Sequence, residues 1–563
     1  MNGLSCSSLM RSALALACAA GPAVASVAEE KATHKHYESS PQADTPGPKG
    51  ELAPRLQNLG KHTFPVTTKS KQAQLFINQG VNLAYGFNHA EAARSFKEAA
   101  RLDPNCAMAY WGQALVLGPN INVAMTPDDE PKAYEAAQKA LSLKGKASPR
   151  ERAYIEAVAK RYTGKAADRA AADKAFADAM RDVVKRYPDD LDAAAIFAEA
   201  VMDLRPWNYW TQDGTPYPET KEAAAAIEKV LARNPNHPAA LHYWIHLMEA
   251  HHPERAEAAA DRLSPLMPGA GHMVHMPSHI YQRVGRYEDA RKSNEKASLA
   301  DEDYIAQCRA QGIYPMAYYP HNVHFLWFAA TAEGKSAQAI ESARKVASKV
   351  SDEMLQQLPL LAAFRVVPYY ALTRFGKWDE MLQEPAPPSN LFLKGTWHYA
   401  RGLAFTAKGQ LPDAEIELAA LRKIAADPAL KAPLFSQNTA DNILAVGPEV
   451  LAADIAAKRK DYNSAIAHLD RGVRLEDGLV YTEPTEYHYP VRQALAAVLL
   501  EAGRAREAET VYWEDLRRNP DNGWSLFGLT QAIRAQGKDA SAVEQRFKKA
   551  WANADVKLSG SRF

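Results

Sequence analysis

Histidines are concentrated in one part of this chain. Ten of the 17 histidines fall between His237 and His324. Seven of the ten recur at spacings of three or four residues: His242 and His246; His272, His275 and His279; His321 and His324. Residues three or four apart lie on one face of a helix, so each set is predicted to present its imidazoles on one side of its own helix.

Clustered imidazoles are suited to binding transition metals. Imidazole binds zinc, copper, nickel and iron, while the thioether of methionine selects Cu(I), and Met273 and Met276 lie within the central histidine run. A zinc site needs three or four ligands at about 2.0–2.1 Å from the ion. The seven histidines are therefore candidate ligands for copper or zinc. The acids that would orient their rings are Glu249, Asp301, Glu302 and Asp303.

A simpler interpretation of the same residues stays open. Histidines that face a groove can hydrogen-bond neighbouring side chains, backbone groups or a bound peptide. Three further histidines are expected at exposed hairpin turns: His237, His251 and His252. Three more are isolated and are expected to be structural: His398, His468 and His488.

Pro277 interrupts the central histidine run. Proline inside a helix removes one backbone hydrogen bond and clashes with the carbonyl four residues earlier. The sequence leaves two outcomes open: a helix that begins near Met276, or a helix that is kinked. In the first case His272 and His275 lie on the loop that enters the helix.

The helices that carry these residues belong to a repeating pattern. From about Leu56 the chain is rich in Ala, Leu, Glu, Lys and Arg, with Gly or Pro every 12–20 residues, which predicts helices and no strands. The first repeat is marked by an aromatic residue, glycine, small residues and a closing proline: Phe76, Gly80, Ala92, Phe96, Ala99 and Pro104. This order resembles the tetratricopeptide repeat, a helix pair with a period of 34 residues. Similar punctuation recurs near Gly285, Gly334, Gly376, Gly409, Tyr462 and Gly503.

The resemblance implies an all-α, right-handed solenoid of stacked antiparallel helical hairpins. It also implies that the first helix of each hairpin lines a concave groove. In that register His272, His275 and His279 face the groove, as do His321 and His324, with His242 and His246 beside them. Two aromatic insertions break the period, at residues 203–219 and 301–319. Insertions in solenoids map to one face, often the binding face.

The N-terminus has the features of an export signal. Arg11 precedes the apolar stretch 12–20, and the small residues Ala23-Val24-Ala25 predict cleavage after Ala25. The expected organisation is a signal peptide at 1–25, a disordered tether at 26–55, a helical-repeat region with the histidine-rich groove at 56–350 and a second helical-repeat region at 351–563. The expected location is the bacterial periplasm or the outside of the cell. Lipid anchoring at Cys18 is the alternative.

Composition excludes several classes of function. Lys+Arg is 67 and Asp+Glu is 66, so no strong field of one sign favours nucleic acid or an anionic membrane. No uncharged apolar run long enough to span a membrane follows the signal peptide. Phosphate-binding, nucleophile-elbow, HExxH and CxxC motifs are absent. Cys106 and Cys308 are expected to be free thiols, although pairing stays open. The acids at 128–130 and 189–190 are expected to be solvated.

The resemblance implies a scaffold that binds a peptide or protein partner in its concave groove. The alternative is a periplasmic copper- or zinc-binding protein that uses the seven histidines. A metal-dependent enzyme is a third hypothesis. Because no catalytic motif is present, its activity would have to come from the same seven histidines.

Overall fold

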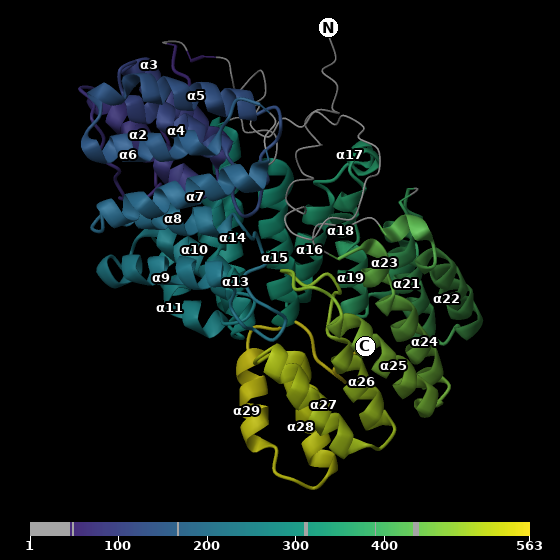
Figure 1. Ribbon diagram of the computed structural model, residues 1–563. Helices are drawn as coiled ribbons and strands as arrows, with labels where there is room; N and C mark the ends of the chain where they lie inside the picture. The colour runs from purple at the N-terminus through teal and green to yellow at the C-terminus, as the bar shows by residue number, and fades with distance from the viewer. Residues whose placement is uncertain (1–45, 48–49, 166–167, 309–313, 389, 432–437) are drawn as a thin grey trace. The chain divides into compact units, whose positions relative to one another are not determined.

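The computed structural model describes residues 46–47, 50–165, 168–308, 314–388, 390–431 and 438–563, which are mainly α-helical (Figure 1). Within these ranges no β-strand occurs, and only two isolated bridges form, Asn120 with Val123 and Trp210 with Pro216. Successive helices joined by short connections pack against each other as antiparallel hairpins. The expected all-α solenoid of stacked hairpins is confirmed.

The chain divides into two compact units, each of which is described by itself. Unit 1 comprises residues up to 280 together with 296–319, and unit 2 comprises 281–295 and 320–563. The chain thus passes between the two units within residues 280–320. The expected signal peptide at 1–25 and most of the expected tether at 26–55 lie outside the described residues.

Unit 1 is built from short helices that pair in sequence order. They are α2 (Lys71–Tyr85), α3 (His89–Leu102), α4 (Ala107–Leu117), α5 (Glu130–Leu143), α6 (Pro149–Val158), α7 (Arg169–Arg186), α8 (Leu191–Met202), α9 (Pro218–Arg233), α10 (Pro238–Met248), α11 (Glu257–Leu263) and α12 (Gly271–His275). Helices α13 (Pro277–Arg283) and α14 (Tyr287–Cys308) contribute residues to both units. Consecutive helices of this unit pair as the hairpins α6–α7, α8–α9 and α10–α11.

Small residues allow the first hairpin to close tightly. The position of a Cβ added to Gly80 on α2 would lie 2.7 Å from the ring of Phe96 on α3. Gly112 on α4 approaches the same ring, because its added Cβ would lie 2.4 Å from it. Ala92 and Ala99 are fully buried between these helices. The residues that mark the repeat in the sequence therefore form the helix–helix contact surface, as expected.

Unit 2 continues the pattern with its own helices. They are α15 (Tyr319–Ala332), α16 (Ser336–Ala347), α17 (Asp352–Gln357), α18 (Ala362–Arg365), α19 (Val367–Arg374), α20 (Trp378–Gln383), α21 (Leu391–Ala407), α22 (Leu411–Ala425), α23 (Ala440–Leu444), α24 (Val446–Lys458), α25 (Tyr462–Asp477), α26 (Val491–Glu501), α27 (Ala505–Arg518), α28 (Gly523–Ala535) and α29 (Ser541–Ala550). Tyr319 at the start of α15 belongs to unit 1. Gly409 and Gly503 turn the chain between α21 and α22 and between α26 and α27, with φ of 78° and 76°. Glycine adopts this left-handed conformation without the penalty that a Cβ brings.

The two aromatic insertions have different structures. Residues 203–217 connect α8 to α9 without a helix, as expected. In the second insertion, residues 301–308 are instead the end of α14, and Tyr314–Tyr318 form a π-helix. Residues 309–313 lie outside the described residues. The second insertion is therefore partly helical, because α14 extends about two turns beyond the repeat pattern.

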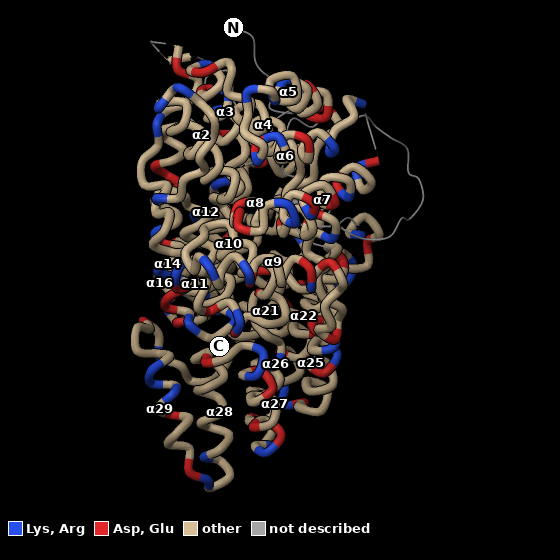
Figure 2. Tube along the Cα trace, turned by 60° about the vertical axis from the view of Figure 1, so that its left-hand side comes forward, with Lys and Arg blue, Asp and Glu red and all other residues tan. Residues whose placement is uncertain are grey.

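The surface charge agrees with the balanced composition. Basic and acidic residues are interspersed along the helices (Figure 2). None of the described helices is both long and apolar enough to cross a membrane.

Candidate metal centre

Five of the seven candidate histidines lie in unit 1. His242 and His246 are on α10, His272 and His275 on α12, and His279 on α13. All five side chains are buried, with exposed fractions between 0% and 3%. His321 and His324 lie on α15 in unit 2 and are half-buried. In that unit His324 stacks on Trp327 with ring centroids 5.2 Å apart, as expected for a structural histidine.

Burial corrects the expectation that the unit 1 histidines face an open groove. Every residue of α10 is buried, and every residue of α12 is buried. A helix that is covered on all sides is a core helix. The repeat register describes which side of a helix faces the groove, but the packing of other elements decides whether that side is open.

The chain breaks its helix at Pro277. Helix α12 ends at His275, and α13 begins at Pro277. The Ser278 hydroxyl donates to the carbonyl of His275 at 2.7 Å. The structure is therefore closer to the first expected outcome, a helix that begins near Met276. It differs in that His272 and His275 lie on a short helix of their own and not on a loop.

Gly271 allows α12 to start close to α14. A Cβ added at this position would lie 1.8 Å from Oδ1 of Asp301 and 3.0 Å from the carbonyl oxygen of Ala297. Asp301 is fully buried and accepts a hydrogen bond from the Tyr314 hydroxyl at 2.7 Å, so it is held in place. The backbone N–H of His272 donates to the same hydroxyl at 3.2 Å.

Replacing Gly271 with alanine is expected to destabilise unit 1 by about 1–3 kcal/mol, because the added methyl group overpacks this contact. Urea unfolding of the two proteins measures the difference. Gly145→Ala is the matched control, since nothing lies within 4 Å of a Cβ added there. If Gly271→Ala were as stable as the control variant, the close approach of α12 to α14 would be contradicted.

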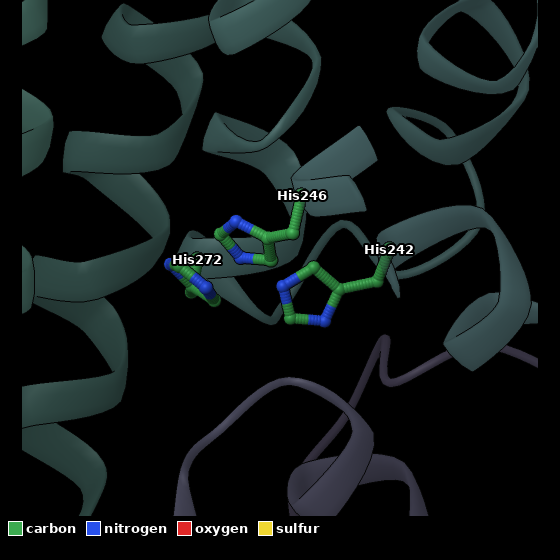
Figure 3. Close-up of side chains that lie close together, drawn as sticks. All are labelled: His242, His246 and His272. Carbon is green, nitrogen blue, oxygen red and sulfur yellow. The ribbon is translucent and has the colours of Figure 1, made fainter. Parts of the chain in front are cut away.

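Three of the buried imidazoles converge. His242, His246 and His272 each offer one ring nitrogen, and these three atoms lie within 4.8 Å of one another. The ring centroids of His242 and His246 are 4.8 Å apart, and those of His242 and His272 are 5.0 Å apart. Figure 3 shows the three rings gathered around a common region between α10 and α12. We call these three residues the histidine triad.

Hydrogen bonds fix the tautomers of two triad members. Nδ1 of His242 lies 2.7 Å from the carbonyl oxygen of Tyr85, so Nδ1 carries the proton and donates. Nδ1 of His246 lies 3.1 Å from Oε1 of Glu249 and donates in the same way. In a neutral imidazole the other nitrogen then holds a lone pair. Nε2 of both residues is therefore an acceptor.

These lone pairs are buried without a donor. No described residue forms a hydrogen bond with Nε2 of His242 or with Nε2 of His246. The two ring nitrogens of His272 also have no hydrogen-bond partner among the described residues. Buried polar atoms in proteins are nearly always paired, and each exception requires an explanation. Four unsatisfied nitrogens on three adjacent rings are therefore the feature of this site that requires an explanation.

The triad is held in its neutral form. Burial lowers the pKa of His242 and of His272 well below the usual value of 6.5, and nearby histidine charges lower both further. Burial also lowers the pKa of His246, although the charge of Glu249 opposes this shift. Protonation is thus a costly way to satisfy these nitrogens. A neutral imidazole is the form that binds a metal ion.

Glu249 connects the triad to the remaining two histidines. Its Oε2 lies 2.7 Å from Nδ1 of His279, and Nε2 of His279 lies 2.9 Å from Nε2 of His275. Burial would raise the pKa of Glu249, but the charges of His279 and His246 lower it overall. A carboxylate that orients a ligand histidine is a common partner of metal sites. The expected orienting role of Glu249 therefore fits this geometry.

The other expected orienting acids have different hydrogen bonds. Asp301 accepts from Tyr314, as described above. Glu302 accepts from the hydroxyl of Tyr319 at 2.7 Å, and Asp303 accepts from the amide of Gln307 at 2.6 Å.

Aromatic side chains lie around the triad. The distance between ring centroids is 4.5 Å for Phe87 and His242, 5.2 Å for Trp207 and His246, and 4.9 Å for Tyr318 and His272. Phe87 and Trp207 both have positive φ, 58° and 61°. A bulky residue in this region costs about 1–3 kcal/mol, and such strain concentrates at functional sites. Trp207 and Tyr318 lie in the two aromatic insertions that break the repeat, at residues 203–219 and 301–319, whereas nothing in the sequence singled out Phe87.

Several expectations outside the triad are corrected or confirmed. His237 is not at an exposed turn but is 1% exposed and caps the start of α10. Asp129 and Glu130 are buried and hydrogen-bonded, not solvated. His251 is exposed, as expected. Cys106 and Cys308 are free thiols, and both are buried.

Comparisons with known proteins identify no family. No protein-family model matches the chain, and no curated protein matches it. Among solved structures, the human IFIT1 dimer with m7Gppp-AAAA is 12% identical with a TM-score of 0.30, covering 87% of this chain and 92% of that one. The APC/C heterotetramer Cut9–Hcn1 is 17% identical with a TM-score of 0.30, covering 82% and 76%. Yeast Tom70 is 11% identical with a TM-score of 0.26, covering 85% and 91%. Likenesses at this level carry no argument about function.

Proposed function

We propose that unit 1 binds one transition-metal ion through His242, His246 and His272. The observation that carries this proposal is the set of buried ring nitrogens that converge without a donor. A metal ion satisfies several lone pairs at once. A single proton satisfies one, and burial opposes it at each triad ring.

The spacing of the triad suits an ion with small adjustments. Three atoms within 4.8 Å of one another all lie within about 2.8 Å of a common point. Each nitrogen therefore has to move by less than about 1 Å to reach a metal–nitrogen bond length of about 2.0–2.1 Å. Small rotations about side-chain torsions supply such a movement.

The donor set favours zinc or copper, the ions expected from the sequence. Three neutral imidazoles suit Zn²⁺ and both copper ions, whereas Mg²⁺ and Ca²⁺ require oxygen ligands. Glu249 adds a negative charge beside His246, which favours a bound cation and fixes the ring orientation. Nothing in this arrangement implies a particular reaction, so the enzyme hypothesis gains no support.

The scaffold hypothesis has less support at the histidines than the metal hypothesis. Side chains that are 0–3% exposed do not contact a peptide in an open groove. Binding of a protein or peptide partner elsewhere on the helical repeats stays a prediction that rests on the repeat resemblance. Export to the periplasm also stays a prediction, because the signal residues lie outside the described part of the chain.

Metal analysis of the untagged full chain tests the proposal. We expect one equivalent of zinc or copper to bind after the protein has been stripped with a chelator and titrated. X-ray absorption at the metal edge is expected to show a nitrogen shell at about 2.0–2.1 Å with imidazole scattering. A protein that takes up no ion, or an ion bound only by oxygen atoms, would contradict the proposal.

A further inference from the structure

A second histidine cluster, made of residues other than the triad, lies in unit 1 around the carboxylate of Asp192. Oδ1 of Asp192 lies 2.9 Å from Nε2 of His62 and 3.2 Å from Nε2 of His237, and it accepts from the Tyr85 hydroxyl at 2.7 Å. Nδ1 of His237 accepts from the backbone N–H of Ala240 at 3.4 Å. The proton of neutral His237 is therefore on Nε2, directed at the carboxylate, which disfavours a metal ion there.

The carboxylate also fixes the tautomer of His62. Burial would raise the pKa of Asp192, but hydrogen bonds from His237 and His62 hold it well below its usual range. An ionised carboxylate only accepts, so Nε2 of His62 carries a proton and Nδ1 of the neutral ring holds a lone pair. The side chain of His62 is 15% exposed, and no described residue hydrogen-bonds its Nδ1.

His62, Asp192 and His237 lie at the wall of a cavity of about 950 Å³. This volume is large enough for a small organic molecule. The residues that line it include Lys61, Arg186 and the N-terminal residues of α8 and α10.

Three basic side chains, Lys61, Arg150 and Arg186, and three acidic ones, Asp189, Asp190 and Asp192, line the cavity. Asp190 pairs with Arg150 at 2.5 Å, and Asp189 pairs with Arg233 at 3.0 Å. The carboxylate of Asp192 is hydrogen-bonded by three groups, from His62, His237 and Tyr85. Lys61 and Arg186 are exposed and have no ion-pair partner among the described residues. Two cations without an ion-pair partner and one imidazole lone pair thus belong to residues that line the same cavity, together with the ionised Asp192.

We propose that this cavity binds a small anionic ligand that carries a carboxylate or phosphate group. Lys61 and Arg186 contact the charged oxygens, and Nδ1 of His62 accepts a hydrogen bond from a hydroxyl or amino group of the same ligand. Arg and Lys are the side chains that bind such oxyanions by charge-assisted hydrogen bonds. The simpler alternative is that both cations are only solvated, and it predicts no saturable protection of the cavity.

The test uses His62 as its own reporter. Diethyl pyrocarbonate modifies neutral imidazole, and mass spectrometry of the full chain gives the modification rate at each histidine. Inorganic phosphate and succinate serve as separate probes for the two oxyanion chemistries. We expect at least one of them to slow the modification of His62 in a saturable way while the exposed His251 reacts at an unchanged rate.

Charge-removal variants make the test specific. In Lys61→Ala/Arg186→Ala the probe concentration for half-protection is expected to rise on the order of 10-fold or more, since two charge-assisted contacts are lost. Lys229→Ala/Arg262→Ala removes the same charge outside the cavity lining and is expected to behave like the parent chain. The proposal is overturned if neither probe protects His62, or if the two double variants lose protection equally.

Discussion

Replacing His246 with alanine is expected to weaken metal binding on the order of 100-fold. Structural zinc sites bind with an apparent free energy of about 10–16 kcal/mol shared among about four ligands, so the loss of one ligand removes a large fraction. His242→Ala and His272→Ala are expected to have effects of the same size, because each supplies one of the three converging nitrogens. Isothermal titration of the metal-free proteins with Zn²⁺ measures the affinities.

The control for these variants is His251→Ala. This histidine lies close to α10 in the sequence but is exposed, so its loss is expected to leave the affinity for metal unchanged. Far-ultraviolet circular dichroism establishes that each variant retains its helices. Equal affinities in the parent chain and all three triad variants would show that the ion is held elsewhere.

Acid is expected to destabilise the metal-free protein through the triad. A histidine in the unfolded chain titrates near pH 6.5, whereas burial lowers the pKa of His242, His246 and His272 in the folded chain. Below pH 6.5 the unfolded state therefore binds more protons than the folded state. The free energy of unfolding is therefore highest above pH 6.5 and decreases as the pH falls below that value. The expected loss between pH 6.5 and pH 5.5 is about 1 kcal/mol for each of His242 and His272, whose pKa values lie well below 6.5, and less for His246.

A difference measurement separates the triad from other titrating groups. Urea unfolding at the two pH values is compared between the parent chain and His272→Gln, which has no titrating group at this position. The variant is expected to lose about 1 kcal/mol less between the two pH values. His251→Gln serves as the control and should follow the parent chain. A pH dependence that does not change in His272→Gln would mean that His272 titrates normally.

The sequence predicted the local features of the candidate site. Spacing placed His242 with His246 and His272 with His275 on common helices, and Pro277 marked the helix break. These features depend on residues within about one or two helical turns, where helix periodicity and proline chemistry are decisive.

Burial and tautomers could not be predicted in the same way. The carbonyl that orients His242 belongs to Tyr85, 157 residues earlier in the chain. Phe87, which covers the same ring, owes its position to a left-handed backbone that its residue type does not predict. His62 lies far from His237 in the sequence, and only the fold brings both to Asp192. Such contacts depend on how distant helices dock.

The distance along the chain between Tyr85 and His242 has a consequence for the order of assembly. Closing a loop of 157 residues costs conformational entropy, and contacts of this kind form late in folding. In the unfolded chain the three triad histidines are separate groups on a flexible polymer. The native arrangement of imidazoles therefore exists only after α2 has docked on α10. An ion that prefers this arrangement binds the folded state and not the unfolded chain. It would therefore stabilise unit 1 after folding and would not direct its folding.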